Sequence, residues 1–148
     1  MNKVFKWGII GLGKIAEKFA ADLPYSKNGV LHAVASRSLS KAGEFAKKHR
    51  ALHTCGSYEE ILSVPDLDAV YIATPHHLHY ENTIMCIEAG IPVLCEKPFA
   101  INLNQAEQMV ALARDKNVFL MDALWTRFLP HFIAVSYTHL TLPTICSV

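Results

Sequence analysis

A glycine-containing segment near the N-terminus has the residue types and spacing that hold the phosphates of a dinucleotide. Gly11, Gly13 and Ala16 fit the pattern G-x-G-x-x-A, directly after an apolar run and directly before a helical pattern. The first glycine permits a tight turn, the second lets a pyrophosphate approach the backbone, and the alanine lets the helix pack closely on the sheet. The free N–H groups and the helix dipole would then face the phosphates. The alternative is a tight turn in an α/β protein that binds no ligand.

The end of the second apolar run bears on which dinucleotide would bind. About 20 residues after such a loop, an NAD site has an Asp or Glu that binds the ribose 2′-hydroxyl. This sequence has Ser36, Arg37 and Ser38 there, and the next carboxylate is Glu44. An arginine and two hydroxyls would attract a 2′-phosphate that a carboxylate would repel, so NADP is the preferred cofactor and NAD remains an option. The alternative is an ordinary exposed arginine in a turn.

Glu96, Lys97 and Pro98 follow a later buried run, at the sheet edge where open α/β sheets bind ligands. A lysine at this place can donate a hydrogen bond to a substrate oxygen and share in proton transfer. The alternative is a surface ion pair, which contributes little to stability. The spacing alone does not distinguish the two interpretations.

The elements that must position these residues alternate along the chain. Strands are predicted at residues 4–10, 30–35, 53–55, 68–73, 92–95 and 118–122, and helices at residues 14–23, 38–49, 58–62, 80–89 and about 104–116. Gly90 is expected just after the end of one helix, and Asn104 with Glu107 is expected to form the capping box of the last. Strands that alternate with helices predict a parallel sheet with crossover helices, an α/β doubly wound fold.

Composition excludes several classes of protein. The 148 residues are 51% hydrophobic and 18% charged, which suits one domain with a core and excludes a disordered chain. The net charge is +1 and there is no basic stripe, so no nucleic-acid partner is expected. The N-terminus lacks a signal-peptide pattern, and residues 128–148, although free of Asp, Glu, Lys and Arg, are too interrupted for a membrane span.

Cysteine and histidine usage predicts no metal site. The four cysteines form no C-x-x-C pair, and their sparseness suggests reduced thiols, a reducing compartment and therefore a cytoplasmic location. The histidines at positions 76, 77 and 79 are a compositional hint at metal binding and no more.

The motifs taken together resemble the Gfo/Idh/MocA oxidoreductases, relatives of glucose–fructose oxidoreductase and inositol dehydrogenase. The segments are residues 8–16 (GIIGLGKIA), 73–79 (ATPHHLH) and 95–99 (CEKPF). Residues 122–130 (DALWTRFLP) are most similar to the branch of dihydrodiol dehydrogenases and NADP-dependent xylose dehydrogenases. The resemblance covers about residues 4–134 and implies a Rossmann domain that binds NAD(P).

The resemblance also implies a role for individual positions. Pyrophosphate would contact Gly11, Leu12, Gly13, Lys14 and Ile15, and the adenosine ribose would contact Ser36 and Arg37. Further cofactor contacts would come from Ala73, Thr74, Pro75, His76 and Glu96. Lys97 would be the catalytic lysine, and His79, Trp125 and Arg127 would border the substrate. Trp125 also has a plain interpretation as a core aromatic at a domain junction, and Arg127 as a structural residue.

Members of this family continue into a second α/β domain that supplies the acid/base partner of the lysine and much of the oligomer interface. We therefore expect a dinucleotide-binding domain over residues 1–122, the start of a connection over 123–134, and a tail without family counterpart over 135–148. The tail has the character of translated adapter or frameshifted sequence, and the alternative is a short β-tail. On this view the second domain is missing from these residues.

The expected parent is an NADP-dependent, homo-oligomeric dehydrogenase that moves hydride between nicotinamide and a sugar, polyol or cyclic diol. Residues 1–148 alone are expected to bind the dinucleotide weakly and without turnover. A competing hypothesis is a non-catalytic dinucleotide sensor on the same fold, since a fold alone does not decide function. A methyltransferase would need an acidic residue at the end of the second strand, where Ser36 and Arg37 stand.

Overall fold

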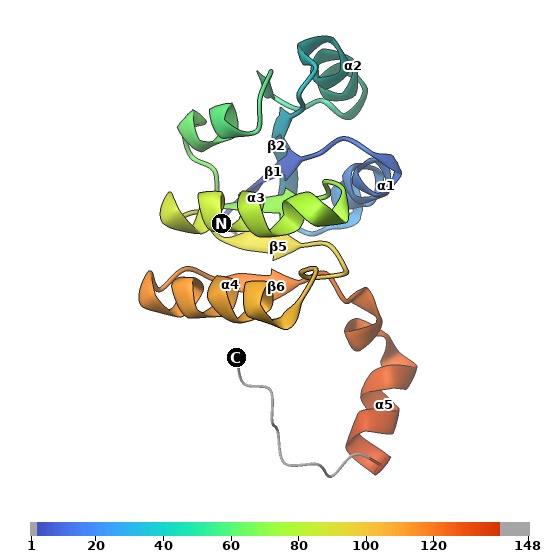
Figure 1. The fold of residues 1–148 in the computed structure, drawn as a ribbon. Coiled ribbons are helices and arrows are strands. Elements are labelled where there is room, and N and C mark those ends of the chain that lie inside the picture. The colour runs from blue at the N-terminus through green and yellow to red at the C-terminus, as the bar shows by residue number, and fades with distance from the viewer. Residues whose placement is uncertain (1–2, 140–148) are drawn as a thin grey trace.

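A six-stranded parallel sheet forms the centre of the molecule (Figure 1), in the order β3-β2-β1-β4-β5-β6. The computed structural model describes residues 3–139. The strands are β1 (Phe5–Ile10), β2 (Gly29–Ala35), β3 (His53–Cys55), β4 (Ala69–Ile72), β5 (Val93–Cys95) and β6 (Leu120–Asp122). The helices are α1 (Lys14–Asp22), α2 (Leu39–His49), α3 (His79–Glu88), α4 (Leu103–Asp115) and α5 (Pro130–His139), with short 3-10 turns η1 (Leu23–Tyr25), η2 (Glu59–Ser63), η3 (His76–Leu78) and η4 (Trp125–Phe128). The predicted doubly wound α/β fold is confirmed.

The strand order reverses beside β1, and this reversal fixes where a ligand can bind. β1 pairs with β2 on one side and with β4 on the other, and both pairings are parallel. The chain therefore moves outward from β1 to β3 and then returns to continue in the opposite direction. In open α/β sheets, ligands bind at such a switch point, in the crevice outside the carboxyl ends of the strands.

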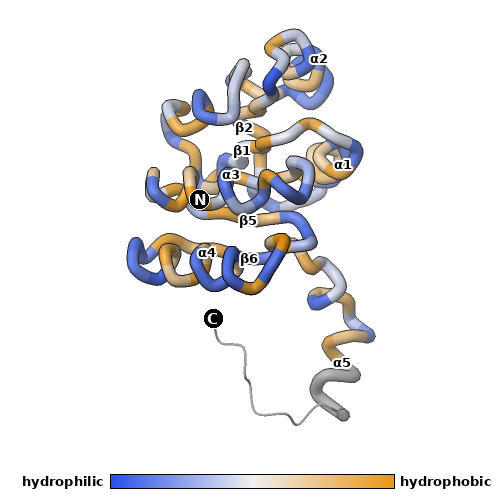
Figure 2. Tube along the Cα trace, in the orientation of Figure 1, coloured by the Kyte–Doolittle hydropathy of each residue, from blue (hydrophilic) through white to orange (hydrophobic). Residues whose placement is uncertain are grey.

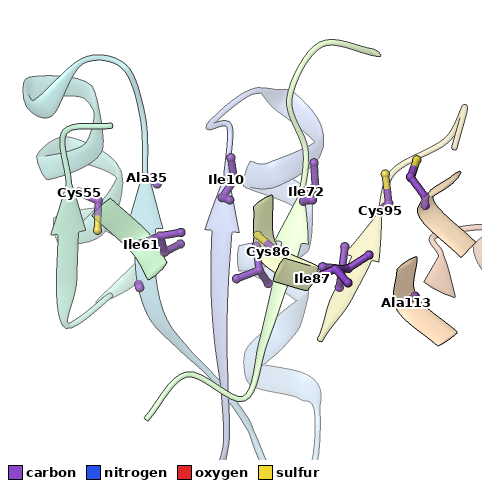
Figure 3. Close-up of a cluster of buried hydrophobic side chains, with 13 residues drawn as sticks. Ile10, Ala35, Cys55, Ile61, Ile72, Cys86, Ile87, Cys95 and Ala113 are labelled. Carbon is purple, nitrogen blue, oxygen red and sulfur yellow. The ribbon is translucent and has the colours of Figure 1, made fainter. Parts of the chain in front are cut away.

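Both faces of the sheet are buried under helices. Successive residues of a strand point to opposite faces, so each strand contributes to two core clusters. Ile9 belongs to one core cluster and Ile10 to the other, and Tyr71 and Ile72 divide in the same way. Alanines and Phe45 of α1 and α2 pack on the first face, and residues of α3 and α4 on the second (Figure 3). The central strands are mostly apolar, with Lys6 in β1 and His32 in β2 as exceptions, while the helices alternate polar and apolar positions (Figure 2). Burial on two faces explains this high apolar content of the central strands.

The predicted element boundaries agree with the structure to within about two residues, with one error at a helix start. The N-cap of α4 is Asn102, whose Oδ1 accepts a hydrogen bond from the Gln105 N–H at 2.9 Å. The Gln105 Oε1 in turn accepts from the Ile101 N–H at 3.3 Å. The expected box at Asn104 and Glu107 is wrong, because the same pattern occurs two residues earlier and the helix begins there. Gly90 was predicted to follow the end of a helix, where a left-handed backbone is common, and it has φ +74° just beyond α3.

The end of the described chain is more regular than the pattern predicted. α5 runs from Pro130 to His139 and therefore crosses the boundary expected between residues 134 and 135. Proline is well suited to the first position of a helix, where no N–H is needed. The remainder of the tail, residues 140–148 with Cys146, lies outside the described residues. No helix within residues 3–139 is long and apolar enough to cross a membrane.

Candidate functional site

The turn after β1 has a backbone that requires glycine at its first position. Gly11 has φ +86°, a conformation that residues with a side chain rarely adopt. A Cβ at this position would lie 2.7 Å from the backbone nitrogen of Thr74 and 2.8 Å from its Cα. The turn therefore passes directly against the segment that follows β4. This contact brings together two segments that the sequence separates by about sixty residues.

Gly13 leaves the start of α1 open. It is the N-cap residue of α1. Among the described residues, no side chain caps the helix there, and no heavy atom counted lies within 4 Å of the position where a Cβ would be. The N–H groups of the first helical turn have no partner within a helix, so they are available to an anion. Ala16, one turn on, is fully buried against the sheet. The loop thus fits the phosphates of a dinucleotide.

A hollow of about 720 Å³ lies outside the carboxyl ends of β1, β2 and β4. Its walls are Leu12, Gly13, Lys14 and Ile15 from the glycine loop, Ser36, Arg37, Ser38 and Lys41 from the turn after β2, Tyr58, and Ala73, Thr74 and Pro75 after β4. Most of the predicted cofactor positions therefore meet around one space. Gly11, His76 and Glu96 are not among its walls, although the turn at Gly11 lies against the wall residue Thr74.

The electrostatic character of the hollow is one-sided. Of the residues that the structure describes, three cations, Lys14, Arg37 and Lys41, line it and no carboxylate does. Within residues 3–139, none of these three side chains forms an ion pair. Unpaired cations around a concave site attract an anionic ligand. The site thus suits a ligand that carries several phosphates.

The turn after β2 is held by two serines. The Ser36 Oγ accepts a hydrogen bond from the Ser38 N–H at 3.2 Å, and the Ser38 Oγ accepts from the Lys41 N–H at 3.4 Å. Ser38 is the N-cap of α2, so Lys41 falls in the first turn and reaches the hollow. Ser38 was expected at this place as one of two hydroxyls, whereas Lys41 and Tyr58 were not predicted to line the site. The helix start at residue 38 was the signal that could have indicated Lys41.

Glu96 and Lys97 do not form the surface ion pair that was one interpretation of their spacing. Glu96 is buried, and its Oε1 accepts a hydrogen bond from the Tyr71 hydroxyl at 2.5 Å while its Oε2 accepts from the Lys97 N–H at 3.0 Å. Burial, followed by the hydrogen bond to Glu96, raises the pKa of Tyr71, so this hydroxyl stays protonated and donates. Glu96 therefore anchors the backbone of Lys97.

Lys97 lies exposed at the same edge of the sheet as the hollow. The Glu96 N–H donates to the Ile72 carbonyl oxygen at 3.0 Å, so Glu96 directly follows the strand pair formed by β4 and β5. Ala73 and Thr74, which line the hollow, leave the same pair on the β4 side. No hydrogen bond or ion pair of the Lys97 ammonium occurs within residues 3–139. Its amine is thus available to a ligand.

The three residues expected to border substrate have different environments. His79 is fully buried and contacts backbone carbonyls, whereas Trp125 is 62% exposed and belongs to neither core cluster. Trp125 is therefore not a core residue within residues 3–139, and its interpretation as an aromatic at a domain junction stays a prediction. Arg127 lies 3.8 Å from the Asp122 carboxylate and lines a separate hollow along α4 and β6. It shares no wall with the space around the glycine loop.

The described cysteines are buried and free. Cys55, Cys86 and Cys95 form no disulfide. Burial raises the pKa of the Cys86 and Cys95 thiols to about 12, so neither is a ready nucleophile. Within residues 3–139, no group of three or more His, Cys, Asp or Glu side chains is arranged to hold a metal ion.

Comparison with known proteins decides the family of this chain. Residues 5–123 match the sequence profile of the oxidoreductase family with an NAD-binding Rossmann fold, Gfo/Idh/MocA. The chain belongs to the Gfo/Idh/MocA family. The resemblance of its motifs to these oxidoreductases is thereby confirmed, and the chain contains the NAD(P)-binding Rossmann domain of a dehydrogenase family.

Individual Gfo/Idh/MocA proteins are similar over most of the chain. Trans-1,2-dihydrobenzene-1,2-diol dehydrogenase from Bos taurus is 45% identical over 128 residues, which are 84% of this chain and 38% of the relative. A solved structure of KijD10, a 3-ketoreductase from Actinomadura kijaniata in complex with TDP-benzene and NADP, is 30% identical with a TM-score of 0.84, over 90% of this chain and 42% of that one. An NAD binding oxidoreductase from Klebsiella pneumoniae is 33% identical with a TM-score of 0.79, over 90% and 38%. The chain thus spans about two fifths of the length of these relatives.

Proposed function

We propose that these residues are the NADP-binding part of a dehydrogenase that acts on a hydroxyl-bearing carbon of a sugar, polyol or cyclic diol. The choice of NADP is supported by the hollow, which in the described part of the chain has three cations without an ion pair and no carboxylate. NADP has one phosphate more than NAD, and its 2′-phosphate lies where Arg37 replaces the usual acidic residue. The substrate class is supported by relatives that are named dihydrodiol dehydrogenase and 3-ketoreductase.

Each residue of the hollow has a defined task in this proposal. The N–H groups at the start of α1 bind the pyrophosphate, next to the open position at Gly13. Arg37 and Lys41, both exposed and without an ion pair in the described part of the chain, bind the 2′-phosphate. Ala73, Thr74 and Pro75 form the opposite wall. When bound, the nicotinamide supplies a hydride acceptor or donor.

Lys97 carries the chemical step on the protein side. In the direction of reduction, its ammonium donates a hydrogen bond from Nζ to the substrate oxygen, stabilises the negative charge that develops there as the C–H bond forms, and gives that oxygen a proton. In the direction of oxidation, the neutral Lys97 amine takes the hydroxyl proton as the C–H bond breaks. Glu96 holds the Lys97 backbone through the 3.0 Å hydrogen bond, and Tyr71 fixes Glu96 in turn. Lys97 is thus a catalytic residue of the proposed reaction, and Glu96 and Tyr71 position it.

The cofactor preference is tested by titrating residues 1–148 with NADP and with NAD. Arg37→Ala and Lys41→Ala are each expected to weaken NADP binding by about tenfold or more, because a hydrogen bond to a charged group is lost, and to leave NAD binding nearly unchanged. Lys47→Ala is the matched control, since Lys47 is exposed on α2 and lies outside the hollow. Equal losses for NADP and NAD would show that these cations do not bind the 2′-phosphate.

A further inference from the structure

An asparagine in the loop before β2 is followed by glycine, and this pair has a chemistry of its own. Asn28 and Gly29 are the only Asn–Gly step among the 148 residues. Asparagine is one of the residue types that heat and time degrade. The backbone nitrogen of the next residue can attack the side-chain amide carbon, and glycine leaves that nitrogen open because it has no Cβ. Asn28 is exposed and lies between η1 and β2, outside any helix or strand.

Three hydrogen bonds hold this dipeptide in the folded chain. The Gly29 N–H donates to the Ser26 Oγ at 2.8 Å, and the Asn28 Nδ2 donates to the Lys3 carbonyl oxygen at 3.0 Å. The Asn28 carbonyl oxygen accepts from the Phe5 N–H at 2.8 Å. The first bond engages the nitrogen that would attack, and the second engages the amide that would leave. Both must open locally before the two atoms can react.

The space around Gly29 explains why a reactive pair occurs at this place. A Cβ at position 29 would lie 2.6 Å from the Ser26 Oγ and 2.9 Å from the Leu23 Cδ1. A side chain there would therefore displace the acceptor of its own N–H. Asn28 in turn supplies the donor for the Lys3 carbonyl oxygen. The two residues that stabilise the start of β2 are thus the two that react with each other.

We propose that Asn28 is a site of spontaneous deamidation whose rate depends on opening of the hydrogen bond between Ser26 and Gly29. The Gly29 nitrogen forms a bond to the Asn28 Cγ, the bond from Cγ to Nδ2 breaks, and ammonia leaves with the Gly29 amide proton. Water then adds to either carbonyl carbon of the five-membered ring and opens it, which gives aspartate or isoaspartate at position 28. The overall reaction consumes one water and releases one ammonia, without oxidation or reduction.

The product disturbs the start of the β1–β2 pair. A carboxylate at position 28 has no N–H to donate to the Lys3 carbonyl oxygen. Isoaspartate also lengthens the backbone by one carbon directly before Gly29, which pairs with Phe5. The dinucleotide hollow lies at the opposite, carboxyl ends of the strands. We therefore expect the modified chain to unfold at a lower urea concentration and to bind NADP as the unmodified chain does.

Mass spectrometry of residues 1–148 aged in mildly alkaline buffer tests the proposal. Cleavage after lysine and arginine gives peptides 28–37 and 117–127, each with a single asparagine and no glutamine. Asn117 is the internal control, because it is also exposed but precedes Val118, whose branched side chain shields the backbone nitrogen. We expect only peptide 28–37 to gain the mass that separates a carboxyl group from an amide, relative to an unaged sample. No gain, or an equal gain in both peptides, would overturn the proposal.

A pair of serine variants tests the role of the hydrogen bond. Ser26→Ala releases the Gly29 N–H and should speed the reaction by about fivefold. Ser57→Ala is the matched control, since the Ser57 Oγ accepts from the Glu60 N–H at 3.3 Å in another exposed loop, and it should leave the rate unchanged. A Ser26→Ala rate equal to that of the unaltered chain would show that this hydrogen bond does not limit the reaction.

Asn28→Gln separates deamidation from other changes during ageing. Glutamine keeps a side-chain amide but would have to close a larger ring, so the aged variant should keep both its mass and its unfolding midpoint. A midpoint that falls equally in the variant and in the unaltered chain would contradict the predicted loss of stability. The mass change is read without a ligand, so the proposal does not depend on the proposed function. If fresh protein does not bind NADP, the cofactor proposal fails and the deamidation result is unaffected.

Discussion

Gly11 and Gly13 are two residues apart, yet glycine is needed at position 11 for the backbone fold and at position 13 only to leave space for a ligand. Gly11→Ala would place a Cβ 2.7 Å from backbone atoms in a positive-φ conformation. We expect it to cost about 2 kcal/mol or more in free energy of unfolding. Gly13→Ala meets nothing within 4 Å and has φ −96°, so its effect on stability should stay within about 0.5 kcal/mol.

The same pair of variants separates folding from binding. Gly13→Ala fills the space next to the start of α1, where the pyrophosphate would approach, so NADP affinity should fall while urea unfolding stays close to that of the unaltered chain. Gly11→Ala should move the unfolding midpoint itself. A Gly13→Ala variant that binds NADP as well as the unaltered chain would show that the phosphates do not approach the backbone there.

At the scale of single residues, the sequence was sufficient to predict which residues lie in the candidate site, but not which hydrogen bonds they form. The glycine loop and Arg37 could be identified because their chemistry depends on neighbours in the chain. The bond between Tyr71 and Glu96 joins residues 25 positions apart, and no local pattern indicates it. The two carbonyls that His79 contacts likewise depend on how β4 and β5 lie side by side.

The start of α4 offers a test of which asparagine caps the helix. Asn102→Ala removes the side chain that accepts from the Gln105 N–H at 2.9 Å and should lower the free energy of unfolding by about 1 kcal/mol. Asn104→Ala, within the first turn, should leave it unchanged or raise it slightly, because alanine has the higher helix propensity. Urea unfolding of both variants measures this. A larger loss at Asn104 would restore the capping box predicted from the sequence.

The beginnings of β1 and β4 are joined by a carboxylate whose effect depends on pH. Asp68 accepts hydrogen bonds from the Lys3 ammonium at 2.5 Å and from the Lys6 N–H at 2.8 Å. The bond from Lys3, and then the one from Lys6, holds the pKa of Asp68 below its ordinary value. Its stabilisation is therefore complete above the pKa of the unfolded chain, near 4, and is lost as the pH falls through the lower folded value.

Asp68→Asn should accordingly be less stable than the unaltered chain at neutral pH, and the difference should shrink as the pH falls below about 4. The measurement is urea unfolding across this pH range. Asp66→Asn is the control, because the Asp66 side chain is 76% exposed in its contact with Lys6 and an exposed pair contributes little. A difference that persists unchanged into acid would mean that the charge of Asp68 is not what joins the strands.

At the scale of elements, the sequence predicted the order of strands and helices because apolar runs and helical spacing recur in nearly every one of them. Its errors lie at element ends, where the choice between Asn102 and Asn104 depends on the path of the preceding loop. The helix over Pro130–His139 was also missed, since its residues include threonine and histidine and carry little helical periodicity. Caps and mixed-composition helices depend on contacts that a linear pattern does not contain.

At the scale of the whole molecule, these residues supply the cofactor-binding part of the proposed active site and its lysine, Lys97. The chain spans 38% of the length of the dihydrodiol dehydrogenase it matches. We expect residues 1–148 on their own to bind NADP without measurable reduction of NADP in the presence of xylose or a cyclic diol. Absorbance of the reduced nicotinamide reports turnover. A rate that Lys97→Ala abolishes would show that these residues suffice for catalysis.

The exposed aromatic side chains on the β6 side predict how these residues behave in solution. Phe119, Trp125 and Phe128 are 65%, 62% and 62% exposed, and β6 has a strand neighbour on only one side within residues 3–139. Apolar surface beside an unpaired strand edge favours association. The mass of residues 1–148 measured by light scattering should therefore rise with concentration.

Phe119→Ser should reduce this association, because Phe119 directly precedes the edge strand. Tyr25→Ser is the matched control, since Tyr25 is an exposed aromatic of η1, between α1 and β2 and away from this edge. Equal masses for the two variants would place the contact elsewhere on the surface. A single-chain mass at every concentration would mean that neither the exposed aromatics nor the free edge of β6 drives assembly.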